Sequence, residues 1–185
     1  MLVAAKGDLN AFEQIVLRHQ QTAWAVAKRF LGDPTEAEDV AQDAFLKILA
    51  AAPRYRPSAA FRTFLIRVVS RLCMDRARKM HPLYTDEPPE LTASGPSASE
   101  SALRAERDNA IRHALDALPP AQRMAVVLRY YEDLDYRAIA EAMDTTEKAV
   151  ERLLARARVA LRVPLGQFKA TETGSGGGFG PLARL

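Results

Sequence analysis

DYRAIAEAMDTTEKAVERLLARARVALR, residues 135–162, decides the fold of the C-terminal half of this chain. Apolar residues recur at helical spacing on both sides of a polar interruption at residues 144–146, which predicts two helices joined by a tight turn. The second helix carries bases every four residues, at Lys148, Arg152 and Arg156, on a different side from its apolar stripe. This layout is typical of a helix-turn-helix DNA reader, and a helical hairpin with a solvated basic face is the alternative.

Outward from this stretch, the apolar periodicity predicts an all-α chain, because no alternating pattern lasts long enough to indicate a sheet. In the first 80 residues the pattern predicts three helices, at residues 8–31, 34–52 and 59–80. Between residues 101 and 165 it predicts four helices, of which the last two are the helix-turn-helix pair. The chain is therefore expected to form two small helical domains.

Two other segments have compositions that do not suit a packed core. Residues 81–100 hold four prolines and four acids with no lysine or arginine, and so predict a flexible linker. Residues 166–185 contain six glycines and predict a disordered tail.

Local signals mark the starts of three helices. Asp33 is the expected N-cap of the second helix, with Pro34 at its first position and Glu36 placed as in a capping box. Asp135 and Thr146 are expected to cap the two helices of the pair.

The charges are unevenly distributed, although the net charge of the 185 residues is only +3. Residues 33–43 contain five acids and no base, whereas residues 54–79 contain eight bases and one acid, Asp75. Such asymmetry indicates two differently charged working surfaces, one of them suited to nucleic acid.

Cys73 is the only cysteine, so an intrachain disulfide is excluded and a reducing compartment is expected. Its apolar neighbours predict a buried side chain. The N-terminal residues do not form a signal peptide, and no stretch approaches the ~18 apolar residues of a membrane span. We therefore expect a cytoplasmic protein without membrane insertion.

Enzymatic chemistry is not indicated. The three histidines, His19, His81 and His113, are isolated, and there is neither a phosphate-binding glycine loop nor metal-ligand spacing. No catalytic residue, metal or cofactor is predicted.

Three sets of motifs, taken in order, resemble the sigma factors of bacterial RNA polymerase, specifically the small extracytoplasmic-function (ECF) group. GDLNAFEQIVLRHQ (7–20) with TEAEDVAQDAFLKIL (35–49) is similar to the first conserved segments of the family, and FRTFLIRVVSRLCMDRARK (61–79) to its promoter-melting helix. LDALPPAQRMAVVLRYYEDLDYRAIAEAM (115–143), with RAR at 156–158, resembles the reader of the upstream promoter element.

The resemblance implies a division of the chain. Residues 1–80 correspond to a three-helix sigma region 2 and residues 101–165 to a four-helix sigma region 4. Residues 81–100 are then the linker and residues 166–185 the tail. The implied function is to bind core RNA polymerase and direct promoter-specific initiation by reading the minus-35 and minus-ten elements and assisting melting.

The acidic helix 34–52 is the segment that, in the family, docks on the clamp helices of the polymerase β′ subunit. Its expected docking residues are Glu36, Glu38, Asp39, Gln42 and Asp43. A solvated helix N-terminus accounts for Glu36, because the helix dipole favours an acid there, but it accounts poorly for Asp43, about two turns in.

The arginine-rich helix 59–80 and the loop before it are expected to capture unstacked bases of the minus-ten element, since aromatic rings stack on exposed bases and cations hold the backbone. The residues for this role are Arg54, Tyr55, Arg56, Arg62, Arg67 and Arg71. Phe61 and Phe64 belong instead to the apolar stripe, and Arg71 stands where many members have asparagine.

The minus-35 element is expected to meet the last helix through Thr146, Lys148, Glu151, Arg152, Arg156 and Arg158. Arg152 is the best placed for direct readout, since arginine binds guanine bidentately. Arg156 and Arg158 suit phosphates or packing. Three residues of this helix depart from the usual family pattern: Glu151, Arg152 and Leu153. The upstream sequence that this chain reads is therefore not expected to follow the family consensus.

The implied partners are promoter DNA, an anti-sigma factor, and core polymerase through its β′ clamp helices and β flap. A stand-alone helix-turn-helix regulator is the alternative, with residues 1–80 used for dimerisation or sensing. The acidic docking helix and the arginine-rich helix argue against that alternative.

Overall fold

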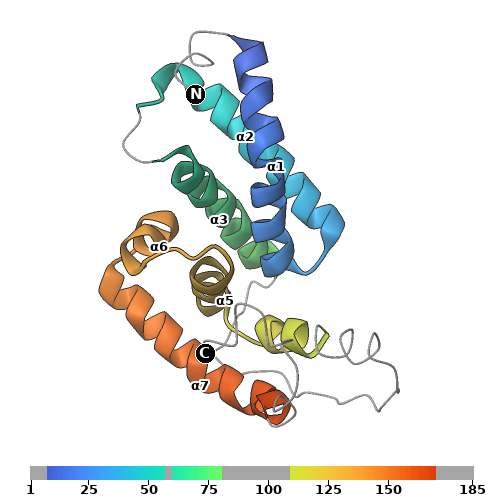
Figure 1. Ribbon diagram of the computed structural model, residues 1–185, viewed down its shortest axis with the longest axis vertical. Helices are drawn as coiled ribbons and strands as arrows, with labels where there is room; N and C mark the ends of the chain where they lie inside the picture. Colours follow the sequence, from blue (N-terminus) through green and yellow to red (C-terminus); the bar gives the residue numbers. More distant parts are fainter. Residues whose placement is uncertain (1–7, 57–59, 81–108, 170–185) are drawn as a thin grey trace.

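The computed structural model describes residues 8–56, 60–80 and 109–169. The predicted linker at 81–100 and residues 170–185 of the predicted tail lie outside these ranges. Every regular element in the described ranges is helical, so the predicted all-α class is confirmed (Figure 1).

The N-terminal unit contains three α-helices and one short 3-10 helix: α1 (Leu9–Leu31), α2 (Pro34–Ala51), η2 (Ala52–Arg54) and α3 (Phe61–Met80). Helix α1 ends at Gly32, whose φ of 80° lies in the region that favours glycine. Helix α2 begins as expected, because the Asp33 carboxylate accepts a hydrogen bond of 2.8 Å from the Glu36 backbone N–H and Pro34 follows the cap.

Large apolar side chains from all three helices fill the core of this unit. Phe30, Ile48, Leu65 and Val69 are at most 1% exposed. Cys73 is also fully buried, as predicted, and burial raises the pKa of its thiol to about 12. The thiol is therefore protonated and unreactive near neutral pH.

The C-terminal unit begins with a helical segment at residues 109–116, and four named elements follow: α5 (Pro120–Val126), the π-helical η3 (Val127–Tyr131), α6 (Tyr136–Met143) and α7 (Glu147–Lys169). Helix α7 thus continues four residues past the predicted boundary at 165. The helical segment before α5, the first of the four helices predicted between residues 101 and 165, ends at residue 116.

The α6–turn–α7 pair has the predicted caps. Asp135 accepts from the Ala138 N–H at 2.7 Å, and the Thr146 hydroxyl accepts from the Ala149 N–H at 3.2 Å. Between them, Asp144 adopts the left-handed conformation with φ of 53° and donates its N–H to the Ala140 carbonyl. The tight polar turn expected from the sequence is therefore present.

The two units pack against each other in the described structure. Helix α3 lies against α6 and α5, and α1 contacts η3 (Figure 1). Buried side chains from both units belong to one continuous apolar core. The sequence predicts two helical domains, and the structure adds an interface between them.

We expect Leu154→Ala to lower the free energy of unfolding by about 2–5 kcal/mol, because Leu154 is 1% exposed and its truncation leaves a cavity. Val159→Ala, on the same helix but 74% exposed, should change the free energy of unfolding by less than about 0.5 kcal/mol. Urea denaturation followed by circular dichroism measures both. Equal losses would contradict the packing of α7.

Candidate nucleic-acid and protein interfaces

The acidic face of α2 is largely engaged within the molecule. The guanidinium of Arg76, on α3, forms an ion pair and hydrogen bond with Glu36. It also lies 3.7 Å from an Asp39 oxygen and 3.6 Å from an Asp43 oxygen. Three of the five expected docking residues therefore share one internal cation.

The electrostatics of Arg76 agree with this geometry. Hydrogen bonding to Glu36 raises the pKa of the Arg76 guanidinium, and attraction to the three carboxylates adds to the rise while partial burial opposes it. The sequence gives a signal for this cluster, since the acids at 36, 39 and 43 share one helix face, but not for the cation that meets them.

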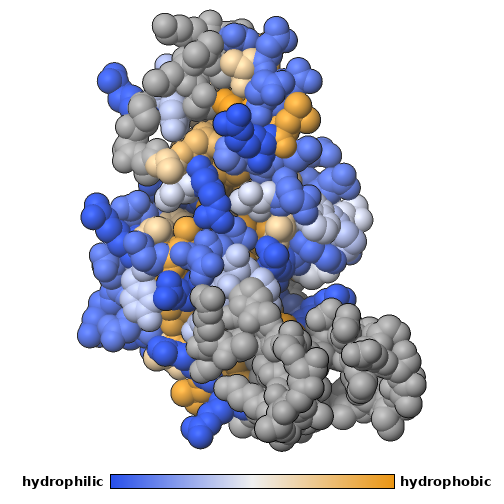
Figure 2. Space-filling view, in the orientation of Figure 1, coloured by the Kyte–Doolittle hydropathy of each residue, from blue (hydrophilic) through white to orange (hydrophobic). Residues whose placement is uncertain are grey.

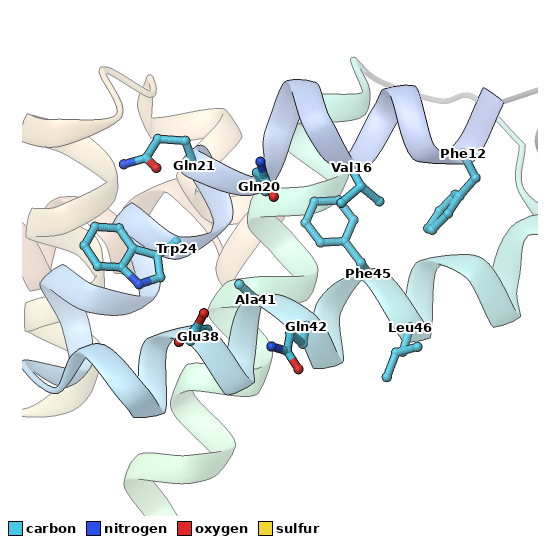
Figure 3. Close-up of a pocket in the computed structure, with 10 residues that line it drawn as sticks. All are labelled: Phe12, Val16, Gln20, Gln21, Trp24, Glu38, Ala41, Gln42, Phe45 and Leu46. Carbon is cyan, nitrogen blue, oxygen red and sulfur yellow. The ribbon is translucent and has the colours of Figure 1, made fainter. Parts of the chain in front are cut away.

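The other two expected docking residues, Glu38 and Gln42, line a groove of about 670 Å³ between α1 and α2. Figure 3 shows Trp24 and Glu38 toward one end of the groove and Phe12 and Leu46 toward the other. The remaining lining residues are Val16, Gln20, Gln21, Ala41 and Phe45. The groove is thus a mainly apolar channel with polar side chains along its edges.

Helices α1 and α2 of the N-terminal unit expose some large apolar side chains. Leu46 is 64% exposed, and Leu9 and Leu17 on α1 are 69% and 56% exposed. Figure 2 shows orange patches interrupting a mainly hydrophilic face in its upper part, where α1 and α2 lie. Leu46 lines the groove, and an exposed apolar side chain on a groove is typical of a protein-binding surface. Leu9 and Leu17 do not line it.

The segment before α3 presents two exposed cations and one anchored ring. Arg54 and Arg56 are exposed. The Tyr55 ring packs on Phe64, with 5.3 Å between ring centroids. As predicted, Phe61 and Phe64 are partly buried against the core, and Phe61 also contacts His19.

The three arginines expected along α3 have different surroundings. Arg62 donates to the Glu132 carboxylate at 2.6 Å and also reaches the Glu132 backbone carbonyl at 3.4 Å. Arg67 pairs with Asp144 at 3.7 Å, and both side chains are mostly exposed. Arg71 is exposed and forms no ion pair within the described residues. Two of the three are thus held by acids of the C-terminal unit.

Glu132 is the most buried acid at this interface, with a side chain 7% exposed. Its second partner is Arg29 of α1, at 3.3 Å, whose guanidinium also lies 4.7 Å from the centre of the Tyr131 ring. Burial raises the pKa of the Glu132 carboxyl, and the guanidinium groups of Arg62 and Arg29 offset part of that rise. The carboxylate therefore depends on both arginines.

A mostly buried cation, Arg123 of α5, also links the units, with a side chain 13% exposed. It donates to the Phe30 carbonyl at the end of α1 at 2.9 Å and to the Asp116 carboxylate at 3.0 Å. It also donates to the backbone carbonyls of Asp116 and Leu118. The bond to Phe30 ties α5 to the N-terminal unit, and the bonds to Asp116 and Leu118 fix the guanidinium within its own unit.

Helix α7 separates its buried and charged residues as the sequence predicts. Val150, Leu154, Ala157 and Leu161 are at most 1% exposed. Lys148, Glu151, Arg152, Arg156 and Arg158 are exposed on the remaining surface.

Three of the charged side chains on α7 have local partners. Lys148 pairs with Glu151 at 3.3 Å, and Arg158 donates to the Leu154 carbonyl at 3.4 Å. Arg152 and Arg156 form no ion pair within the described ranges, so both guanidinium groups are open to a ligand.

Sequence reasoning missed Arg29, Arg76, Arg123 and Glu132. Each is a charged residue next to apolar helix positions, which is a weak signal of a buried partner. Their most distant partners, however, lie 40 to 103 residues away in the chain. Helical periodicity carries no information about which distant charge will meet them.

Neither a metal site nor a membrane span is found in the described residues. No group of three or more histidine, cysteine or acidic side chains there could hold a metal ion. In the same ranges, none of the helices combines the length and apolar character needed to cross a bilayer.

Comparison with known proteins supplies two family matches. Residues 15–81 match the family described as sigma-70 region 2, and residues 108–161 match sigma-70, region 4. The matches fall on the N-terminal and C-terminal units respectively.

Several curated proteins are similar over most of their length. The RNA polymerase sigma-H factor of Pseudomonas aeruginosa is 31% identical over 84% of this chain and 86% of its own. The ECF RNA polymerase sigma factor SigM of Mycobacterium tuberculosis is 32% identical over 86% of this chain and 80% of its own. SigW of Bacillus subtilis, also an ECF sigma factor, is 29% identical over 86% of this chain and 91% of its own.

Solved structures share the fold. CnrH, in complex with the cytosolic domain of CnrY, superposes with a TM-score of 0.62 at 26% identity, over 89% of this chain and 93% of CnrH. The sigma factor RpoE of Bartonella quintana, in complex with the anti-sigma factor NepR, gives the same TM-score at 19% identity, over 84% of this chain and 97% of RpoE.

We predict that Arg76→Ala lowers the free energy of unfolding by about 1 kcal/mol at low salt, because three carboxylates then repel one another at a partly exposed site. The loss should shrink in 1 M NaCl, where the Debye length is about 3 Å. Arg78→Ala is the matched control, since Arg78 is 71% exposed and, among the residues that the structure describes, pairs with Asp75 one helical turn away. Thermal unfolding at two salt concentrations measures the effect, and an equal loss in both variants would contradict it.

Proposed function

We infer from these matches that the chain, which belongs to the ECF group of the sigma-70 family of bacterial RNA polymerase sigma factors, binds core RNA polymerase and directs promoter-specific initiation of transcription. One observation carries this conclusion. Region 2 and region 4 are both matched, in the family order, on the two helical units. A stand-alone helix-turn-helix regulator is not favoured, because it would use only the second match.

We propose residues 1–80 as region 2, residues 101–165 as region 4, residues 81–100 as the connecting linker and residues 166–185 as a tail. The relatives are sigma factors, which are specificity subunits and not catalysts, so we propose a non-catalytic role without cofactor or metal. A cytoplasmic location is proposed because core polymerase works there.

The polymerase-docking face is proposed to centre on Glu38 and Gln42, which border the apolar groove between α1 and α2. Exposed Leu46 and the Trp24 ring supply apolar area, and Glu38 supplies a charge for the basic partner that the family offers. Glu36, Asp39 and Asp43 take part more indirectly, since they face Arg76, which offsets part of their charge and ties α2 to α3.

We propose that the minus-ten element binds along η2 and α3. Tyr55 offers a ring that is already fixed against Phe64, and exposed Arg54, Arg56 and Arg71 offer cations for the backbone. Arg62 and Arg67 belong to the same surface, but reaching DNA requires them to leave Glu132 and Asp144.

We propose that α7 reads the minus-35 element in the major groove. Thr146 starts the helix, and Lys148 and Arg152 lie near its N-terminal end, where recognition helices meet base edges. Because Lys148 is already paired with Glu151, Arg152 is the main reader of base edges. Arg156 and Arg158 lie farther along and suit phosphates.

An anti-sigma factor is the proposed regulator. CnrH was solved with the cytosolic domain of CnrY, and this chain is 26% identical to CnrH over nearly its whole length. The RpoE of Bartonella quintana has an anti-sigma partner and shares the fold.

Replacing Leu46 with aspartate tests the docking face. Leu46→Asp should reduce co-purification with core polymerase at least tenfold, because it places a carboxylate in the apolar part of the interface. Leu17→Asp is the control, since Leu17 is similarly exposed and does not line the groove. Retention of both variants by core polymerase would refute this position of the interface.

Replacing bases on α7 tests the proposed reader of the upstream element. Arg152→Ala should relax sequence preference at one or two base pairs, at a cost of about 1–3 kcal/mol for the preferred site. Arg156→Ala should weaken binding evenly across sequences and reduce the slope of log K against log salt by about 1. Selection of binding sites from randomised duplexes, repeated at several salt concentrations, separates these results. If Arg156→Ala altered the selected sequence and Arg152→Ala did not, the assignment would be reversed.

A further inference from the structure

The side of α7 that faces away from the core is charged near its start and apolar farther on. It carries Lys148, Arg152, Ala155 and Val159, all of them exposed. Val159, the last of the four, is 74% exposed. Helix α7 packs on α5 and α6 through its other side and lies along the outer edge of the C-terminal unit (Figure 1). Packing among the described residues therefore gives no reason for an apolar strip, Ala155 with Val159, on this face.

Ala155 completes a set of positions from which a helix in the major groove can read bases. Homeodomain recognition helices contact the DNA from four positions spaced i, i+3, i+4 and i+7. On α7 this spacing, begun at Lys148, selects Glu151, Arg152 and Ala155. The first three positions are charged and belong to the proposed reader of the minus-35 element. Ala155 is the fourth.

Ala155 is also the member of the apolar strip that base edges can reach. Measured from Glu147, where α7 begins, Ala155 lies about 12 Å along the helix and Val159 about 18 Å, at about 1.5 Å per residue. The major groove is about 12 Å wide. A helix that enters the groove by its N-terminal end therefore places Ala155 within the groove and carries Val159 past it.

The chemistry of the Ala155 side chain selects one base. A methyl group neither donates nor accepts a hydrogen bond. The base pairs present hydrogen-bonding groups in the major groove, and thymine adds an apolar group, its 5-methyl. A favourable contact of Ala155 with a base edge is therefore a contact with thymine.

The position of this thymine follows from Arg152, the proposed reader of guanine. Ala155 lies three residues after Arg152, or about 4.5 Å along the helix. Successive base pairs are about 3.4 Å apart along the duplex. The two side chains thus meet base pairs that are neighbours or next neighbours.

We propose that Ala155 recognises the 5-methyl group of a thymine in the minus-35 element, one or two base pairs from the guanine that Arg152 binds. The inference rests on the proposed role of α7 as the reader of that element. It adds a specificity-determining residue that carries no charge and names the group on the DNA that it contacts.

Deoxyuridine tests the contact, because it differs from thymidine by the methyl group. The preferred duplex is first selected with the full chain, and its thymines are then replaced by deoxyuridine one at a time. One replacement, within two base pairs of the guanine that Arg152→Ala no longer prefers, should weaken binding about fourfold, which corresponds to about 0.8 kcal/mol for one buried methyl-sized group. The other replacements should leave the affinity unchanged. Fluorescence anisotropy of labelled duplexes measures these affinities.

The variant Ala155→Gly removes the methyl group of the protein, so it should bind the thymine and deoxyuridine duplexes equally well. Ala160→Gly is the matched control. Ala160 is exposed on the same helix, about 140° around its axis from Ala155 at about 100° per residue. Both substitutions lower helix propensity alike, and circular dichroism checks that both variants are folded. Ala160→Gly should keep the fourfold preference for thymine.

The base 5-methylcytosine gives a second measurement at the same position, since it carries its methyl group in the same place as thymine. It should bind the parent chain more tightly than cytosine by a similar factor. No thymine sensitive to deoxyuridine near the Arg152 guanine, or a preference for thymine that persists in Ala155→Gly, would overturn the proposal.

Failure of the proposed function would look different. If the full chain selected no sequence at all, the role of α7 as a reader would be contradicted, and the inference with it. A selected sequence that is insensitive to deoxyuridine would overturn the inference and leave that role intact. Binding to core polymerase is examined separately, by the Leu46→Asp experiment.

Discussion

The burial of the Glu132 carboxylate between two guanidinium groups is the interaction on which the arrangement of this molecule depends. An acid that is so little exposed is tolerated only with close partners, and both partners, Arg29 and Arg62, belong to the other unit. The π-helical η3 comes directly before it, and Asp133, directly after it, has a positive φ. Its partners tie the helix-turn-helix unit to the helix proposed to bind the minus-ten element.

Two other arginines, Arg76 and Arg123, also hold helices together through internal contacts. These contacts determine which charged side chains remain free for partners. Arg76 collects three acids of α2 and leaves Glu38 and Gln42 beside the apolar groove. Arg123 fixes α5 to the end of α1 through the Phe30 carbonyl. The surfaces proposed for polymerase and for DNA thus consist mainly of the residues that these internal pairs leave free. Arg62 and Arg67 also belong to the proposed DNA surface, but they must first leave Glu132 and Asp144.

Local sequence signals predicted the elements well, because caps and apolar periodicity act within a few residues. Asp33, Asp135 and Thr146 cap the helices as expected, and the stripe through Val150 and Leu154 is buried. The interface between the units could not be predicted in this way. Glu132 and Arg62 are 70 residues apart, and neither helical period nor composition relates charges at that separation. For the same reason, the expected docking acids could be placed on one helix but not matched to Arg76.

The central claim is that this chain gives core RNA polymerase its choice of promoter. The most direct measurement is run-off transcription by purified core polymerase with and without the chain on a fragmented genomic library, with the transcript starts sequenced. We predict discrete starts that require the chain and share two upstream sequence elements at a constant spacing. No chain-dependent initiation, or starts without a common pair of elements, would contradict the account.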